Sequence, residues 1–141
     1  MNDAERTPMA LAPAQVLCID PGGGRATAAE ARARCDAARA ILQRIPAYRA
    51  ARRDKLVAAD VVDAVVLAAF FTDAVSVGTC AAEFAERWLA AGNAGYRVGA
   101  HVGPVARQED DAVTDRVGGP GASVAQAIME CGDPGHILLS E

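Results

Sequence analysis

The chain has 141 residues, a net charge of −4 and only 4% aromatic residues, so it has the size of one domain and lacks the positive charge and stacking side chains of a nucleic-acid-binding protein. Hydrophobic residues make up 52% of it, which excludes a disordered protein. Its cysteines, Cys18, Cys35, Cys80 and Cys131, lack zinc-ligand spacing, so we expect buried free thiols in a reducing cytoplasm. No apolar run is long enough to cross a membrane and the polar N-terminus does not resemble a signal peptide, so we expect a soluble domain.

The predicted elements alternate between strands and helices. Short apolar runs bounded by Pro or Gly predict strands, and apolar residues at helical spacing predict helices. In the first half of the chain we predict a strand at 14–20, a helix over about 31–45 that ends before Pro46, and two strands within 55–71. A helix from 72 or 73 to 91 and a strand at 96–106 follow. The last predicted elements are a short strand near Val113, a helix over 118–132 and a strand at 136–140. This order predicts a single α+β domain (1–141) with a ferredoxin-like βαββαβ sandwich, its helices packed on one face of one sheet, preceded by a flexible lead at 1–13.

Charged residues in two of these segments invite a functional interpretation. Four arginines, Arg32, Arg34, Arg39 and Arg44, lie on the first predicted helix outside its apolar stripe. They indicate either an acidic partner or a solvated helix face, and we favour the solvated face. Within 55–71, two aspartates interrupt the apolar pattern at a predicted hairpin turn, where an aspartate points to solvent or to a ligand.

Three sequence blocks, in the same order, resemble those of one enzyme family. "RVGAHVGPV" (97–105), "GGPGASVAQAI" (118–128) and "PGHILLS" (134–140) are similar to three motifs of the catalytic domain of class III adenylate and guanylate cyclases. The family commonly continues beyond the last motif, so the resemblance implies that a C-terminal part is absent here. It also places His101 in a structural strand, so we expect a packed core histidine whose ring nitrogens meet backbone groups. Gly99 and Gly103 beside it fit a close approach of a neighbouring element.

The resemblance implies a metal site at two aspartates. Cyclases hold two divalent ions with carboxylates, and the matching positions here are Asp20 and Asp63, the candidate ligands for Mg²⁺ or Mn²⁺, although either could be a turn residue alone. Val62 and Ala64 replace the glycines that flank the second aspartate in the family, and the β-branched valine should restrict the loop, so we expect a weak, partly preserved site. A glycine run after the first aspartate supplies candidate nucleotide-binding residues: Gly22, Gly23 and Gly24.

The other half of the family's machinery is replaced. Ser123 stands where the family has the asparagine that orients the ribose, and Ala127 stands where it has the arginine that stabilises the transferring phosphate. Losing one such donor costs about 10²–10³ in rate, and losing a phosphate-directed arginine costs about 10³–10⁵. The base-selecting lysine is replaced by Ala59, and the second base-reading position carries Arg116 or, with a slip of one residue, Asp115.

Cyclases of this family act as head-to-tail dimers in which each site takes its aspartates from one chain and its asparagine and arginine from the other. The resemblance therefore implies a homodimer that binds ATP or GTP weakly: a degenerate, catalytically weak or inactive regulatory and dimerisation module in cyclic-nucleotide signalling. Two alternatives remain open. The chain could be the metal-binding half of a heterodimer with a second cyclase-like chain, or a slow self-sufficient cyclase that uses Ser123 and a compensating arginine, Arg116 or Arg25.

Overall fold

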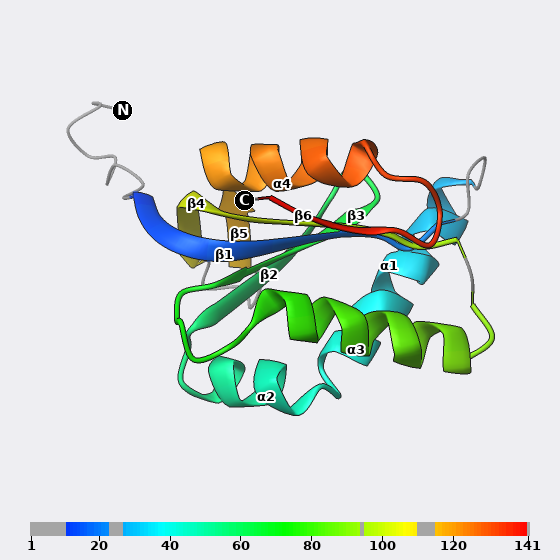
Figure 1. Cartoon of the computed structure of the whole chain (residues 1–141), viewed down its shortest axis with the longest axis horizontal. Coiled ribbons are helices and arrows are strands. Elements are labelled where there is room, and N and C mark those ends of the chain that lie inside the picture. The colour runs from blue at the N-terminus through cyan, green and yellow to red at the C-terminus, as the bar shows by residue number, and fades with distance from the viewer. Residues whose placement is uncertain (1–10, 23–26, 94, 110–114, 141) are drawn as a thin grey trace.

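A computed structural model describes residues 11–22, 27–93, 95–109 and 115–140 (Figure 1). Its elements in chain order are β1 (Leu11–Asp20), α1 (Ala28–Leu42), α2 (Pro46–Arg53), β2 (Val57–Val62), β3 (Val65–Phe70), α3 (Val77–Ala90), β4 (Arg97–Glu109), β5 (Asp115–Gly118), α4 (Pro120–Glu130) and β6 (Ile137–Leu139). The predicted order is confirmed, with α2 as an addition. The strand expected near Val113 begins at Asp115, and Val113 itself lies outside the described residues. Because β1 begins at Leu11, residues 11–13 belong to a strand and not to a lead.

The six strands form one sheet with β1 at its centre. The order is β2-β3-β1-β4-β5, and β6 pairs in parallel with β4 while the other pairs are antiparallel. The four residues from Val16 to Ile19 are fully buried, as the apolar run predicts for a central strand. The register sets Asp20, the last residue of β1, opposite Arg97, the first residue of β4.

Helices cover both faces of this sheet, so the prediction of a single covered face is wrong. On one face, Leu17 and Ile19 of β1 pack against α1, α2 and α3. On the other face, Val16 and Cys18 pack against α4 (Figure 1). The physical reason is that β1 and β3 are apolar at successive positions, and successive side chains of a strand point to opposite faces. Both faces therefore need a cover.

The short helix α2 was not expected, because Pro46 was taken only as the end of the preceding helix. α1 ends at Leu42, and Pro46 occupies the first turn of α2, where the missing N–H of proline costs nothing. Tyr48 of α2 is buried and meets the ring of Phe70 edge-on, with 6.0 Å between the ring centroids. This contact anchors α2 beside the sheet.

α3 begins later than predicted, at Val77 instead of residue 72 or 73. The hydroxyl of Ser76 accepts a hydrogen bond from the backbone N–H of Thr79 and so caps the helix. Ahead of it, the side-chain amide of Gln15 donates to the carbonyl oxygens of Thr72 and Val75, which keeps this segment out of the helix. Among the described residues, no helix is long and apolar enough to cross a bilayer.

Candidate functional site

The two candidate aspartates line one pocket. Asp20 ends β1 and Asp63 lies in the turn between β2 and β3, and both contribute to a cavity of about 360 Å³. The structure therefore brings these two side chains to the same place from strands more than forty residues apart in sequence. The rest of the lining comes from the start of α1, the start of β4 and the last turns of α4: Pro21, Gly22, Ala31, Ala64, Val65, Arg97, Gln126, Met129 and Glu130.

The carboxylate of Asp20 is already engaged within the chain. The Nη2 and Nε atoms of Arg97 donate to its Oδ2 at 2.7 and 3.1 Å. The backbone N–H of Gly22 donates to its Oδ1 at 2.9 Å. Both oxygens thus have partners, and Arg97 already supplies a positive charge beside this carboxylate. Sequence reasoning missed Arg97 because its position beside Asp20 follows from the strand register, which no local pattern reveals.

Asp63 is held in a strained turn. Val62 pairs with Val65 in the hairpin, so Asp63 and Ala64 are the two central residues, and both have positive φ, 49° and 65°. A two-residue turn of this kind favours glycine or asparagine. The expected restriction by Val62 is not found, because this residue lies in the extended strand β2. The strain falls on Ala64, and the turn leaves Asp63 exposed at the mouth of the pocket.

The two candidate catalytic positions on α4 do not line this pocket. Ser123 and Ala127 are both exposed, and neither lines the cavity. Instead α4 presents Gln126 and Glu130, whose side chains lie 3.4 Å apart in a weak hydrogen bond. Sequence reasoning missed these two, although their spacing of four residues places them on one side of a helix. Within one chain, the aspartates and the α4 positions are therefore separate.

The remaining predicted nucleotide contacts are only partly placed. Gly22 lines the pocket with a φ of 87°, a conformation that suits glycine. Gly23, Gly24 and Arg25 lie outside the described residues. Arg116 is exposed on β5 and does not line the pocket. Ala59 of β2 packs against the core cluster on the face of α1–α3, away from α4.

Asp60 has a structural role that the sequence did not reveal. Its Oδ1 accepts a hydrogen bond from the backbone N–H of Val61 at 2.8 Å, and its Oδ2 accepts one from the N–H of Val117 at 3.2 Å. This carboxylate therefore ties β2 to β5, which lies at the other end of the sheet order. It protects backbone donors at a strand edge and is not part of the pocket with Asp20.

His101 is half-buried on β4, and its Nδ1 lies 2.7 Å from the hydroxyl oxygen of Ser140. The expected backbone partner for this nitrogen is thus replaced by a side chain. The predicted close approach of a neighbouring element is confirmed at both glycines, because the backbone of α4 lies against β4 at Gly99 and its residue Gly121 lies near Gly103. The ring of His101, from the same strand, also occupies the space beside Gly103. Across the described ranges, no group of three or more His, Cys, Asp or Glu side chains is arranged to hold a metal ion.

The cysteines are free thiols, as predicted. Three of them are buried, but the prediction of burial is wrong for Cys131, which is exposed at the C-cap of α4. Burial, together with the nearby carboxylates of Asp20 and Glu130, raises the pKa of Cys18 to about 12. A thiol so far from ionisation is not a nucleophile, so Cys18 belongs to the core between β1 and α4.

No protein-family model matches the chain, and no curated protein matches it either. Several solved structures, however, match the chain. The guanylate cyclase domain of RhGC from Catenaria anguillulae in complex with GTP is 16% identical, with a TM-score of 0.61, over 92% of this chain and 78% of that one. A non-canonical dimeric guanylyl cyclase domain of the RhoGC fusion protein from the aquatic fungus Blastocladiella emersonii is 16% identical, with a TM-score of 0.58, over 92% of this chain and 80% of that one. The guanylyl cyclase Cya2 is 14% identical, with a TM-score of 0.54, over 92% and 75%. The chain therefore has the fold of nucleotidyl cyclase catalytic domains.

Proposed function

We propose that this domain is a degenerate cyclase-homology module that binds a nucleoside triphosphate weakly, dimerises and lacks a competent cyclase site as a homodimer. The observation that carries the proposal is the state of α4. The two positions that correspond to the family's transition-state residues are exposed and carry Ser123 and Ala127. An alanine methyl group donates no hydrogen bond, so a second copy would bring no group to stabilise the charge that develops on the transferring phosphate.

The pocket with Asp20 and Asp63 is the half of the site that is kept. Mg²⁺ is commonly held by one or two carboxylates together with substrate phosphates, and these two aspartates fit an ion that arrives with a nucleotide. Such an ion would neutralise triphosphate charge. Without phosphates the fit is poor, because Arg97 already donates to Asp20 at 2.7 Å. Binding of a nucleotide gives this guanidinium an alternative anionic partner in the phosphates.

Dimerisation is supported by the separation of the two halves within one chain. Ser123 and Ala127 are exposed and do not line the pocket of their own chain, so a second chain would have to bring these positions to Asp20 and Asp63. One structure of the same fold is described as a non-canonical dimer and another as monomeric. The same separation supports an alternative function, in which a different cyclase-like chain supplies the asparagine and arginine and completes one active site.

The test is to restore the missing residues. The S123N/A127R variant should convert ATP or GTP to a cyclic nucleotide in the presence of Mn²⁺, at least about 10³-fold faster than the unmodified chain, given the usual effect of a phosphate-directed arginine. Because both positions are exposed, the larger side chains need no repacking of the core. The matched control is S123N/A127K, which restores the charge without the fork of donors and should recover much less. The product is quantified by mass spectrometry.

A mixing experiment tests whether the half with Asp20 and Asp63 can serve a site that another chain completes. A chain carrying D63N/S123N/A127R holds only the restored half, and mixed with the unmodified chain it should give activity that neither shows alone. If the unmodified chain alone is as active as S123N/A127R, the domain is not degenerate and the proposal is wrong. If S123N/A127R stays inactive although it binds nucleotide, the half with Asp20 and Asp63 is not intact, which contradicts the second part of the proposal.

A further inference from the structure

The segment that contains the first two helices, residues 28–55, carries most of the basic residues of this acidic protein. Residues 28–55 contain eight of the fourteen basic residues but three of the eighteen acidic ones, which gives this segment a net charge of +5 and the rest of the chain −9. The ion pairs among the described residues are Arg87–Glu83 and Arg97–Asp20, so no arginine of this segment is neutralised by one. These arginines are Arg32, Arg34, Arg39, Arg44, Arg49, Arg52 and Arg53.

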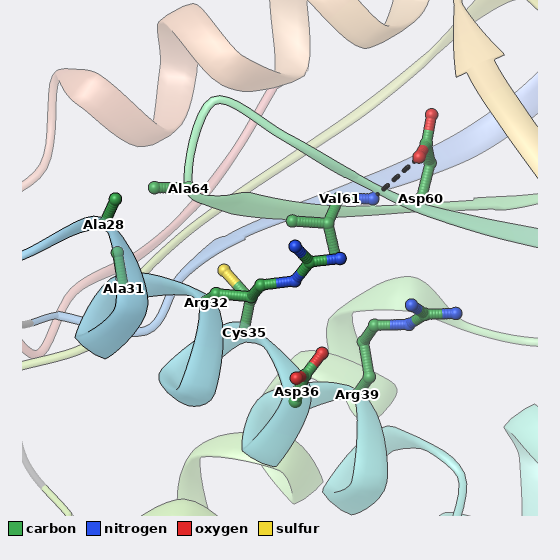
Figure 2. Close-up of a pocket in the computed structure, with 9 residues that line it drawn as sticks. All are labelled: Ala28, Ala31, Arg32, Cys35, Asp36, Arg39, Asp60, Val61 and Ala64. Carbon is green, nitrogen blue, oxygen red and sulfur yellow. Dashed lines mark hydrogen bonds between the residues drawn. The ribbon is translucent and has the colours of Figure 1, made fainter.

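Two of the arginines line a depression between α1 and the hairpin of β2 and β3. The cavity has a volume of about 450 Å³, and its walls include Arg32 and Arg39 of α1 on one side and Val61 with Ala64 on the other. Two acidic residues, Asp36 and Asp60, also belong to its lining. Figure 2 shows both guanidinium groups extending from α1 into this space, while the carboxylate of Asp60 points away from them. The acid nearest to them in sequence, Asp36, forms no ion pair with any described residue.

Three more arginines line a second, more open depression of about 490 Å³ at α2. They are Arg49, Arg52 and Arg53, and Gln43 at the end of α1 completes the lining with Tyr48. The two depressions share no lining residue, but both border α1. Positions 32 and 39 of this helix and its C-cap Gln43 fall on one side at 3.6 residues per turn. We call the two depressions and this side of α1 the arginine trough.

We propose that the arginine trough binds an acidic, extended segment of a partner protein. Guanidinium groups pair with carboxylates through two parallel hydrogen bonds, and five of them without ion-pair partners line the trough. Along the axis of α1, positions 32 and 43 are about 16 Å apart. An extended polypeptide of about five residues has the same length. The surface thus offers several carboxylates of one segment a guanidinium each.

The shape and composition of the trough favour a polypeptide over other polyanions. Among the residues that line it, the only aromatic side chain, Tyr48, is buried, so it offers no exposed ring on which bases of a single-stranded nucleic acid would stack. The arginines line recessed surfaces with no exposed apolar residue that would insert into a membrane. The trough also differs from the pocket with Asp20 and Asp63, with which it shares only Ala31 and Ala64. This inference is therefore independent of nucleotide binding.

The test uses a fluorescein-labelled oligoglutamate peptide and fluorescence anisotropy at low and at physiological ionic strength. The full chain should bind the peptide, and R32Q/R39Q should weaken binding about tenfold or more, since it removes two charged contacts. The matched control is R34Q/R44Q, which removes the same charge from the same part of the chain. Neither Arg34 nor Arg44 lines the trough, so this variant should change affinity less than about threefold, through general charge alone.

A second variant guards against a folding defect, because Arg39 is half-buried. R49Q/R52Q changes two exposed residues. It should weaken peptide binding as strongly as R32Q/R39Q does, with an unchanged circular dichroism spectrum. An oligothymidine of equal charge and phosphatidylserine vesicles serve as competitors. Absence of peptide binding, equal losses in the trough and control variants, or stronger binding to the oligothymidine or the vesicles would each overturn the proposal.

Discussion

Replacing Gly99 by alanine should destabilise the domain more than any other exchange of glycine for alanine in β4 or β5, because α4 lies directly on β4 at this point. An added Cβ would lie 2.5 Å from the carbonyl oxygen of Ala125 and 2.8 Å from the Cα of Met129, and closer still to the backbone nitrogen of Met129. All three are backbone atoms of α4. No side-chain rotation relieves the overlap, so the helix itself has to move.

The size of the effect follows from these distances. Ordinary carbon contacts begin near 3.4 Å, so α4 must shift by about 1 Å to accommodate the methyl group. The shift loosens the buried side chains by which α4 covers its face of the sheet: Ala122, Ala125 and Met129. Overpacking of this kind costs about 1–3 kcal/mol, and we expect the upper end because the obstacle is backbone. That is a large part of a total stability of about 5–15 kcal/mol.

Urea denaturation followed by circular dichroism measures this cost. The matched control is Gly118→Ala, because an added Cβ at Gly118 meets no atom within 4 Å and the residue ends β5. The control should change the free energy of unfolding by less than about 1 kcal/mol. If Gly99→Ala costs no more than Gly118→Ala, the close packing of α4 on β4 is refuted, and with it the placement of Ser123 and Ala127 on the outer side of α4.

Three further predictions concern the turn, the thiols and the strand edge. Ala64→Gly should stabilise the domain by about 0.5–1 kcal/mol in the same urea experiment, because it relieves a φ of 65°; a loss of stability would contradict the turn geometry. In the native protein at about pH 8, iodoacetamide should modify the exposed Cys131 and leave Cys18 untouched in peptide mapping, because burial raises the pKa of Cys18 to about 12. The pKa of Cys18 is raised above its ordinary value of 9.0, so the folded state keeps a proton that the unfolded chain releases above pH 9. The free energy of unfolding should therefore fall as the pH rises from 9 towards 12. Asp60→Ala should lower the free energy of unfolding by about 1–3 kcal/mol, because it leaves two backbone donors without an acceptor. Asp60→Asn keeps one acceptor oxygen and should lower it by less. Equal losses in the two variants would argue against these hydrogen bonds.

The fold was largely predictable because its signals are local. Apolar runs such as 14–20 and the helical stripe through Val77, Ala81, Phe84 and Trp88 follow from periodicity alone, and all four stripe residues are buried. The boundaries were less accurate where a cap or a proline decides them. Ser76 delays α3, and Pro46 begins a helix where proline was taken only to end one.

The candidate site was predictable only where the resemblance supplied it. Asp20 and Asp63 were found through motifs, and the structure places them in one pocket. Arg97, Gln126 and Glu130 were missed because their proximity to Asp20 depends on strand register and on the face of α4 that meets the sheet. A single sequence records neither of these tertiary relations.

The kept and the replaced halves of the site differ in what they do for the fold of their own chain. Asp20 accepts hydrogen bonds from Arg97 and Gly22 and so joins β1 to β4 and to the following turn. Ser123 and Ala127, by contrast, are exposed, and their side chains support no neighbouring element. Replacing Asp20 should therefore perturb the domain, whereas replacing Ser123 or Ala127 should leave it intact. The presence of Asp20 is therefore explained by structure alone and is weak evidence for catalysis, which is why restoring the α4 residues tests the activity more sharply than removing the aspartates.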